Sequence, residues 1–216
     1  MDPVTAILLN WKRPGNVRII IPTLRRQSAS PHIVLVDNGD YTPWTPEQAP
    51  DEVWKLPHNV GPFARFLAAY AYEGWIYFQD DDVVPVEPTF IEDLLSAAKE
   101  RPNAITGAYG RHVNPEPPHY RHSDTTGKTN FVKTICMMMH RTTLGRVRFP
   151  TGNIGRCDDL WVGFETAQGE SIHFSDIELQ PRLALLQQMG VGQSQQPGHY
   201  IEREQFCADW LAGEYR

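Results

Sequence analysis

Three adjacent aspartates, Asp80, Asp81 and Asp82, carry the clearest chemistry in the sequence. They directly follow residues 75–79 (WIYFQ), an apolar run typical of a buried strand. Adjacent carboxylates repel one another and destabilise a fold unless a cation neutralises them. Mn²⁺ and Mg²⁺ prefer oxygen ligands, and Mg²⁺ usually takes one or two carboxylates together with substrate phosphates. Because side chains i and i+2 of an extended segment lie on the same side, we expect Asp80 and Asp82 to share a metal site while Asp81 points away.

The segments that must position these carboxylates alternate between strand and helix patterns. Strands are predicted at residues 4–10, 32–36, 53–56, 75–79, 104–107, 131–139 and 172–174. Helices are predicted at residues 16–27, 62–72, 89–100, 158–168 and 200–211. Residues 110–130 lack periodicity and are predicted to form a loop. This alternation predicts an α/β fold with a mixed, mainly parallel central sheet flanked by helices, in a single domain.

Polar side chains follow three of the predicted strands. Asn10 and Arg13 follow the first strand, Asp37 and Asn38 follow the second, and the three aspartates follow residues 75–79. In open α/β sheets, ligands bind outside the carboxyl ends of the strands. We therefore expect these side chains to meet at one edge of the sheet.

Length and composition exclude several classes of protein. The chain has 216 residues, of which 41% are hydrophobic, so it is too apolar to be disordered. Its net charge of −6 argues against nucleic-acid binding by overall charge, although residues 101–150 alone carry +6. Neither a phosphate loop nor a G-x-G-x-x-G motif is present. The sequence shows no signal sequence and no apolar span long enough to cross a membrane, and its three cysteines are predicted to be free thiols. We therefore expect a soluble cytoplasmic protein with no membrane partner.

Residues 74–85 (GWIYFQDDDVVP) resemble the D-x-D segment of nucleotide-sugar glycosyltransferases of the GT-A fold. Three further segments follow the order of that fold: VTAILLNWKRP (4–14), HIVLVDNGD (32–40) and NVGPFARF (59–66). GRCDDLWVGF (155–164) resembles the C-E-D-I-x-x-N-F segment of the exostosin-like α-N-acetylhexosaminyltransferases, with Asp158 in place of Glu and Gly163 in place of Asn. HYIER (199–203) with Cys207 is similar to that family's H-x-x-x-R…C segment. The resemblance implies a nucleotide-sugar half (1–100) and an acceptor-binding and catalytic half (101–216).

The resemblance also implies roles for individual residues. Asp82, with Asp80, would hold Mn²⁺ (or Mg²⁺), and Asp159 and Arg203 would be catalytic. The residues implied to bind the donor are Asn10, Arg13, Asp37, Asn38, Asn59, Arg65, Asp80, Asp81 and His199.

These roles agree with what glycosyl transfer requires. A metal and an arginine neutralise the leaving diphosphate, and a carboxylate serves the cationic sugar centre or takes the acceptor proton. Asp159 suits either task. Trp161 is a candidate for stacking on a sugar, and Gly190, Gly192 and Gly198 are candidates for letting the segment with His199 and Arg203 close over the donor.

The favoured function is transfer of a hexose or N-acetylhexosamine from a UDP-sugar to a hydroxyl of a carbohydrate or other acceptor, with retention of configuration. One alternative is an inverting enzyme with Asp159 as general base, including one acting on modified nucleic acid through the basic segment 101–150. Another is a non-catalytic nucleotide- or sugar-binding module, which leaves the three aspartates unexplained. The lack of an anchor suggests a bacterial or viral enzyme, or a fragment of a longer chain.

Overall fold

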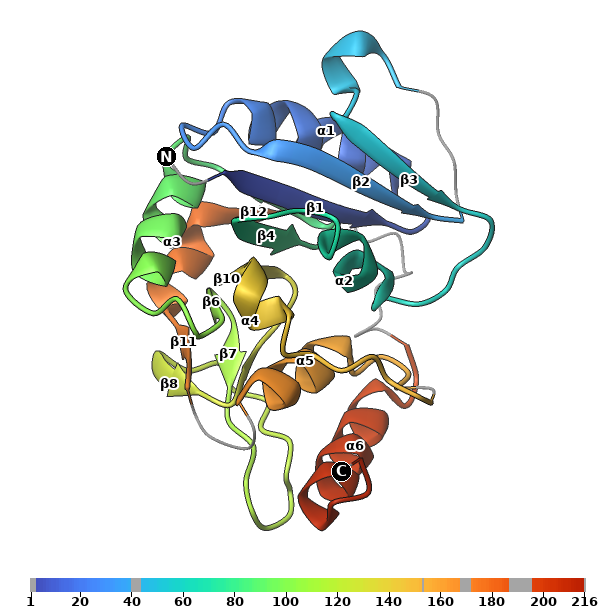
Figure 1. Ribbon diagram of the computed structural model, residues 1–216, viewed down its shortest axis with the longest axis vertical. Helices are drawn as coiled ribbons and strands as arrows, with labels where there is room; N and C mark the ends of the chain where they lie inside the picture. Colours follow the sequence, from blue (N-terminus) through green and yellow to red (C-terminus); the bar gives the residue numbers. More distant parts are fainter. Residues whose placement is uncertain (1–2, 40–43, 153, 168–171, 187–195, 216) are drawn as a thin grey trace.

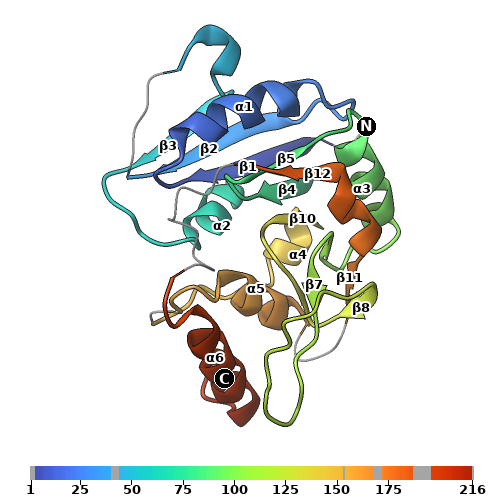
Figure 2. The ribbon, with the colours of Figure 1, turned by 180° about the vertical axis from the view of Figure 1, so that it is seen from behind.

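The computed structural model describes residues 3–39, 44–152, 154–167, 172–186 and 196–215. Its centre is an eight-stranded sheet in the order β3-β2-β1-β4-β10-β6-β11-β8 (Figures 1 and 2). These strands are β1 (Val4–Asn10), β2 (His32–Asn38), β3 (Glu52–Leu56), β4 (Trp75–Gln79), β6 (Thr106–Gly107), β8 (Gly127–Thr129), β10 (Cys136–His140) and β11 (His173–Ser175). Two small ribbons pair β5 (Val83–Pro85) with β12 (Leu183–Leu185) and β7 (Gly110–Arg111) with β9 (Phe131–Val132).

Helices cover both faces of the sheet. They are α1 (Pro14–Arg25), α2 (Ala64–Ala69), α3 (Phe90–Lys99), α4 (Arg141–Leu144), α5 (Asp158–Ala167) and α6 (His199–Ala212), with 3-10 turns η1 (Pro46–Gln48) and η2 (Ile177–Arg182). α1 and α2 lie on opposite faces of strands β1 and β2 (Figure 1). None of the helices in the described ranges is both long enough and apolar enough to cross a bilayer.

Strands β3, β2, β1 and β4 run parallel, and their apolar sequences follow from burial on both faces. In β1, Ala6 and Leu8 pack into the core beneath α1 and α3, whereas Ile7 and Leu9 pack into the core beneath α2 and α5. Side chains alternate between the faces of a strand, so a strand covered on both sides has no polar face. The predicted mainly parallel α/β architecture is therefore confirmed.

The two halves of the sequence share this sheet. β10 pairs antiparallel with β4 over all five of its residues, so the sheet continues from residues 1–100 into residues 101–216. The apolar run 131–139, predicted as one strand, is instead divided between β9 and β10. Between them Lys133 and Thr134 leave the ladder, because β9 pairs with β7 while β10 pairs with β4 and β6.

Two other predictions need correction. Helix α1 begins at Pro14 rather than at residue 16, since a proline needs no helical N–H partner in the first turn. Residues 110–130 are not an unstructured loop, because they contain β7 and β8 and fold back through the bridge between Val113 and Tyr120. Of the three glycines predicted to let the segment with His199 and Arg203 close over the donor, Gly190 and Gly192 lie outside the described residues, as does the last residue of the helix predicted to end at 168. All three cysteines are free and buried, as predicted.

Candidate active site

A cavity of about 370 Å³ opens at the carboxyl ends of β1 and β4. Its lining comes from both halves of the chain: the segments after β1 and β4, helix α2, the turn after β9, and the starts of α5 and α6. This is the edge of the sheet where the sequence predicts the site. Of the predicted residues, Arg13, Arg65, Asp80, Asp81, Asp82, Asp159, His199 and Arg203 line the cavity.

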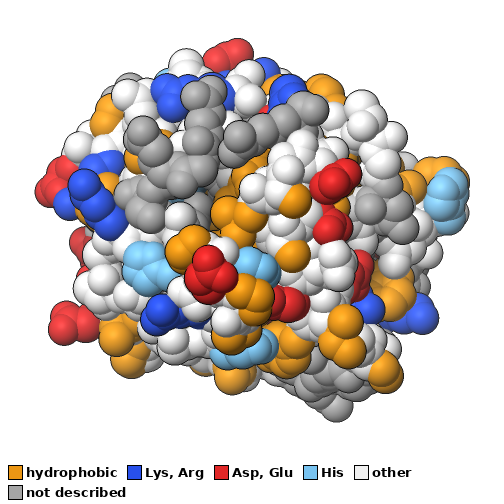
Figure 3. All heavy atoms as spheres, turned by 90° about the horizontal axis from the view of Figure 1, so that it is seen from below, with side chains coloured by type: hydrophobic (Ala, Val, Ile, Leu, Met, Phe, Trp, Pro, Cys, Tyr) orange, Lys and Arg blue, Asp and Glu red, His pale blue; other side chains and the backbone are white. Residues whose placement is uncertain are grey.

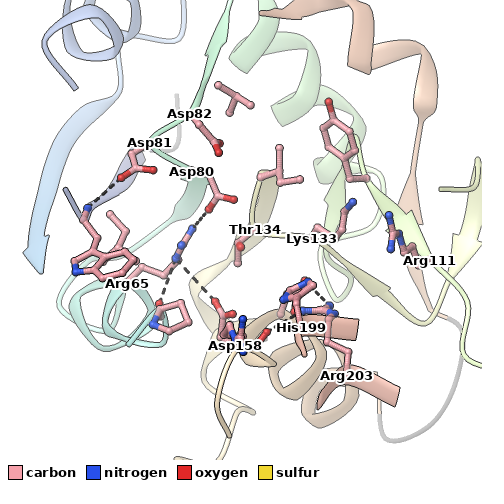
Figure 4. A pocket seen from close by; sticks show the side chains of 18 of the residues that line it. Arg65, Asp80, Asp81, Asp82, Arg111, Lys133, Thr134, Asp158, His199 and Arg203 are labelled. Atoms are coloured by element: carbon pink, nitrogen blue, oxygen red, sulfur yellow. Dashed lines mark hydrogen bonds and ion pairs between the residues drawn. The ribbon is translucent and has the colours of Figure 1, made fainter. Parts of the chain in front are cut away.

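Asp81 differs in its contacts from Asp80 and Asp82, but all three line the cavity, and residues 81 and 82 lie in a turn rather than in the extended segment on which the i, i+2 prediction rests. Asp81 is turned toward Arg13, which it meets in a buried ion pair, and it also accepts a hydrogen bond of 3.0 Å from the Trp11 N–H. The carboxylates of Asp80 and Asp82 lie side by side and face the cavity (Figure 4). Burial, followed by the negative charge of Asp80, raises the pKa of Asp82 to about 6.

Two arginines hold the aspartates in place. The Arg13 guanidinium bridges Asp81 and Asp82, with Nη1 at 3.1 Å from Asp82 Oδ2. Arg65, on α2, pairs with Asp80. Burial opposes the charge of Arg65, but Asp80 and Asp158 outweigh burial and raise its pKa. The chain therefore fixes the carboxylates before any ligand arrives, which lowers the cost of binding one.

A second carboxylate pair opens α5 on another wall of the cavity. Asp159 forms a buried ion pair with Arg203 on α6, at 2.8 Å, and also accepts a hydrogen bond from the Leu160 N–H. Asp158 is equally buried, but its Oδ2 has no hydrogen-bond partner among the described residues and lies 4.0 Å from Arg65 Nε. Burial, and then the charge of Asp159, raise the pKa of Asp158 to about 7. Two neighbouring carboxylates thus have different environments, a pattern typical of acid–base sites.

His199 and Arg203 share one face of α6, as their spacing predicts, and both point into the cavity (Figure 4). Burial, and then the charge of Arg203, lower the pKa of His199 to about 4. His199 is therefore neutral at pH 7. It can donate a hydrogen bond to a ligand, but it cannot neutralise a diphosphate by its charge.

Four of the predicted donor-binding residues do not line this cavity: Asn10, Asp37, Asn38 and Asn59. Asn10 donates a hydrogen bond of 3.0 Å to Asp37, which joins the ends of β1 and β2. Asn38 donates to Asn59 at 2.8 Å and accepts from the Val60 N–H at 2.9 Å. These bonds order the segment that leads to α2 and Arg65.

Trp161 does not face the cavity. It packs edge-on against Trp210 and Tyr215, and its indole N–H donates to the Arg148 carbonyl at 2.7 Å. The prediction that it stacks on a sugar is therefore wrong. Trp161 lies on the side of α5 that packs against α6, whereas Asp158 and Asp159, at the start of α5, line the cavity.

Several lining residues were not predicted individually. Asp158 was named only as the residue that replaces Glu in the resembling segment, and Arg111, Tyr120 and Lys133 were not predicted. The only sequence signal for Arg111 and Lys133 was the net charge of +6 over residues 101–150.

The aspartate pair fits a divalent metal. Among the described side chains, no three His, Cys, Asp or Glu residues gather as a complete ligand set. Asp80 and Asp82 offer two carboxylates, and burial first, then the charge of Asp80, raise the pKa of Asp82, so that a bound cation would favour its ionised form. A metal held by two carboxylates and by phosphate oxygens of a ligand matches this donor set.

No protein-family model and no curated protein matches this sequence. Among solved structures, the mannosyltransferase PcManGT from Pyrobaculum calidifontis, in complex with GDP-Man and Mn²⁺, is similar with a TM-score of 0.60 and 14% identity. That match covers 82% of this chain and 55% of that one. S. aureus TarS 1–349 in complex with UDP-GlcNAc gives a TM-score of 0.59 and 13% identity, covering 82% and 56%. This chain therefore spans little more than half the length of either structure, and the fold it shares with them is the predicted GT-A fold.

Proposed function

We propose that this chain is a metal-dependent glycosyltransferase that transfers a sugar from a nucleoside-diphosphate sugar to an acceptor hydroxyl. The observation that carries the proposal is the cavity itself, where the Asp80–Asp82 pair lies across from Asp158, Asp159 and Arg203. The bound GDP-Man and UDP-GlcNAc of the two similar structures support this donor class. Our specific expectation, carried by the resemblance in sequence, remains a UDP-hexose or UDP-N-acetylhexosamine, as in the exostosin-like family.

In this mechanism Asp82 and Asp80 would hold Mn²⁺ or Mg²⁺, and the bound ion would supply positive charge to the leaving diphosphate. Arg13 and Arg65 keep the aspartates oriented through their ion pairs. His199, uncharged at neutral pH, donates a hydrogen bond to the donor. Asp159 places negative charge beside the sugar centre as that centre becomes cationic. Arg203 fixes Asp159 in position through their buried ion pair.

The stereochemistry depends on which aspartate acts on the acceptor. Asp159 is held in a buried ion pair with Arg203 and so offers a fixed negative charge, which suits the retention expected from the resemblance. An inverting reaction needs a general base, and Asp158 fits that task better than Asp159 because its Oδ2 accepts no hydrogen bond from the described residues and burial raises its pKa to about 7. The anomeric configuration of the product, measured by NMR, distinguishes the two reactions.

The first experiment is calorimetric titration of UDP, with and without Mn²⁺, into the wild type and Asp82→Ala. We expect binding that requires both the metal and Asp82. Asp209→Ala, which removes an aspartate from α6 away from the cavity lining, is the matched control and should bind like the wild type. GDP is titrated in parallel, so that binding of GDP alone would correct the base but keep the enzyme class. Failure of both nucleotides under every metal condition would overturn the proposal.

A further inference from the structure

The wall of the cavity across from the aspartates is basic. Arg111 on β7 and Lys133 after β9 both line it, and Figure 4 shows them on the side opposite Asp80 and Asp82. Both side chains are largely buried, with exposed fractions of 10% for Arg111 and 17% for Lys133. Neither residue has a role in the mechanism proposed above.

The charge on this wall is incompletely balanced. Arg111 Nε and Lys133 Nζ approach the same atom, Asp124 Oδ1, at 2.9 and 3.4 Å. Among the described residues, these two cations form ion pairs with this one carboxylate, whereas Arg13, Arg65 and Arg203 each pair with an aspartate. Burial, and then repulsion by Arg111, lower the pKa of Lys133. A bound anion would relieve this repulsion.

The pair is also held in place before a ligand binds. Arg111 Nη1 donates to the Tyr120 hydroxyl at 2.7 Å, and the Lys133 N–H donates to the Tyr109 carbonyl at 2.8 Å. Lys133 lies in the turn that separates β9 from β10, so the break in the ladder delivers its side chain to the cavity. A fixed guanidinium beside an ammonium group matches a phosphate or carboxylate.

We infer that Arg111 and Lys133 form an anion subsite for a phosphate or carboxylate carried by the acceptor or by the transferred sugar. The inference rests on the proposed function, in which the donor diphosphate occupies the opposite wall at Asp80 and Asp82. The enzyme then selects a negatively charged substrate that a neutral analogue cannot replace.

The test measures binding of matched anionic and neutral probes by calorimetry at constant ionic strength. The acceptor arm compares sn-glycerol 3-phosphate with glycerol on protein saturated with UDP and Mn²⁺, so the diphosphate position is already filled. The donor arm compares UDP-glucuronate with UDP-glucose in Mn²⁺. Both arms use the wild type, Lys133→Met, Lys133→Arg and Lys128→Met, the last removing an exposed lysine of β8 as the charge-matched control.

We expect the wild type to bind the anionic member of one pair at least tenfold more tightly, and the arm that shows the preference identifies which substrate carries the anion. Lys133→Met should reduce the preference below twofold, while Lys133→Arg and Lys128→Met should keep it. Three results would overturn the inference and leave the proposed function standing. They are no preference in either arm, a preference that survives in Lys133→Met, and an equal loss of preference in Lys128→Met. Failure of UDP to bind at all would instead overturn the proposed function, and the inference with it.

Discussion

Asp158 should make stability depend on pH. Its pKa rises from 3.8 in the unfolded chain to about 7 in the fold, so between these values the folded protein holds a proton that the unfolded chain has released. The free energy of unfolding therefore falls as the pH rises from about 4 to 7. Asp158→Asn removes this penalty and should stabilise the protein at pH 8.5, by on the order of 2 kcal/mol, with little effect at pH 4.

Urea unfolding of the wild type and Asp158→Asn at the two pH values measures this difference. Asp209→Asn, on the outer part of α6, serves as the control for a simple loss of negative charge. If the free energy of unfolding at pH 8.5 rises equally in both variants, or does not rise in Asp158→Asn, then burial of the Asp158 carboxylate does not destabilise the protein.

The Asp159–Arg203 pair should show strong energetic coupling. Both side chains are about 95% buried, so removing either one leaves an isolated charge in the interior. We expect Asp159→Ala and Arg203→Met each to lower the free energy of unfolding by about 3 kcal/mol. The double variant should lose clearly less than the sum of the two. Urea unfolding of the four proteins gives the coupling energy, and additive losses would mean that the two groups do not depend on one another.

At the level of elements, the contact between α5 and β9 depends on Gly163. A Cβ atom on Gly163 would lie 2.5 Å from the Cβ and 3.1 Å from the Cα of Phe131, and pairing with β7 limits how far Phe131 can move. Gly163→Ala should therefore lower the free energy of unfolding by about 2 kcal/mol.

A second helical glycine provides the control for Gly163→Ala. Gly15 in the first turn of α1 has open space around the position of a Cβ, so Gly15→Ala should be neutral or stabilising by about 0.5 kcal/mol. Thermal unfolding compares the two variants. Gly163→Ala should lower the melting temperature, Gly15→Ala should leave it unchanged or raise it, and the two values should differ by several degrees. Equal shifts would show that helix propensity, not contact with Phe131, decides both effects.

The sequence predicts the elements best where one local pattern decides them. The boundaries of β1 and β4 match the predicted ones because each strand is a mainly apolar run that ends in a polar residue, Asn10 in β1 and Gln79 in β4. The run 131–139 was wrongly predicted as one strand, because its apolar residues on both sides of Lys133 and Thr134 give no sign of the break there. That break depends on β9 pairing with β7, a partner about 20 residues away whose own two residues have no strand pattern.

At the scale of the whole molecule, the sequence predicted those candidate-site residues that follow the ends of strands or belong to the segments that carry the resemblance. Asp80, Asp82, Asp159 and Arg203 come from three distant segments, and the structure brings them to one cavity. Arg111 and Lys133 are brought to the cavity by the short pairing of β7 with β9. The sequence shows no strand pattern for this pairing, and its only signal is the net charge of residues 101–150. Across the face seen in Figure 3, basic and acidic side chains of the coloured residues are interspersed, with no continuous basic stripe for nucleic acid on that face.

The predicted division at residue 100 separates two halves of the site, but the sheet is continuous across it. Met137 and Met139 of β10 pack into the core on one face of the sheet, and Cys136 and Met138 pack into the core on the other. A chain ending at residue 100 would expose the edge of β4 and leave both cores open, and a long unpaired edge favours aggregation.

We therefore expect residues 1–100 expressed alone to be unfolded or aggregated, and the full chain to unfold in one cooperative step. Far-UV circular dichroism and tryptophan fluorescence should report the same urea midpoint for the full chain, because Trp54 and Trp75 lie in one half and Trp161 and Trp210 in the other. Two separated transitions, or a folded 1–100 fragment that binds UDP, would show that the donor half is an independent domain and that the continuous sheet does not couple the two halves.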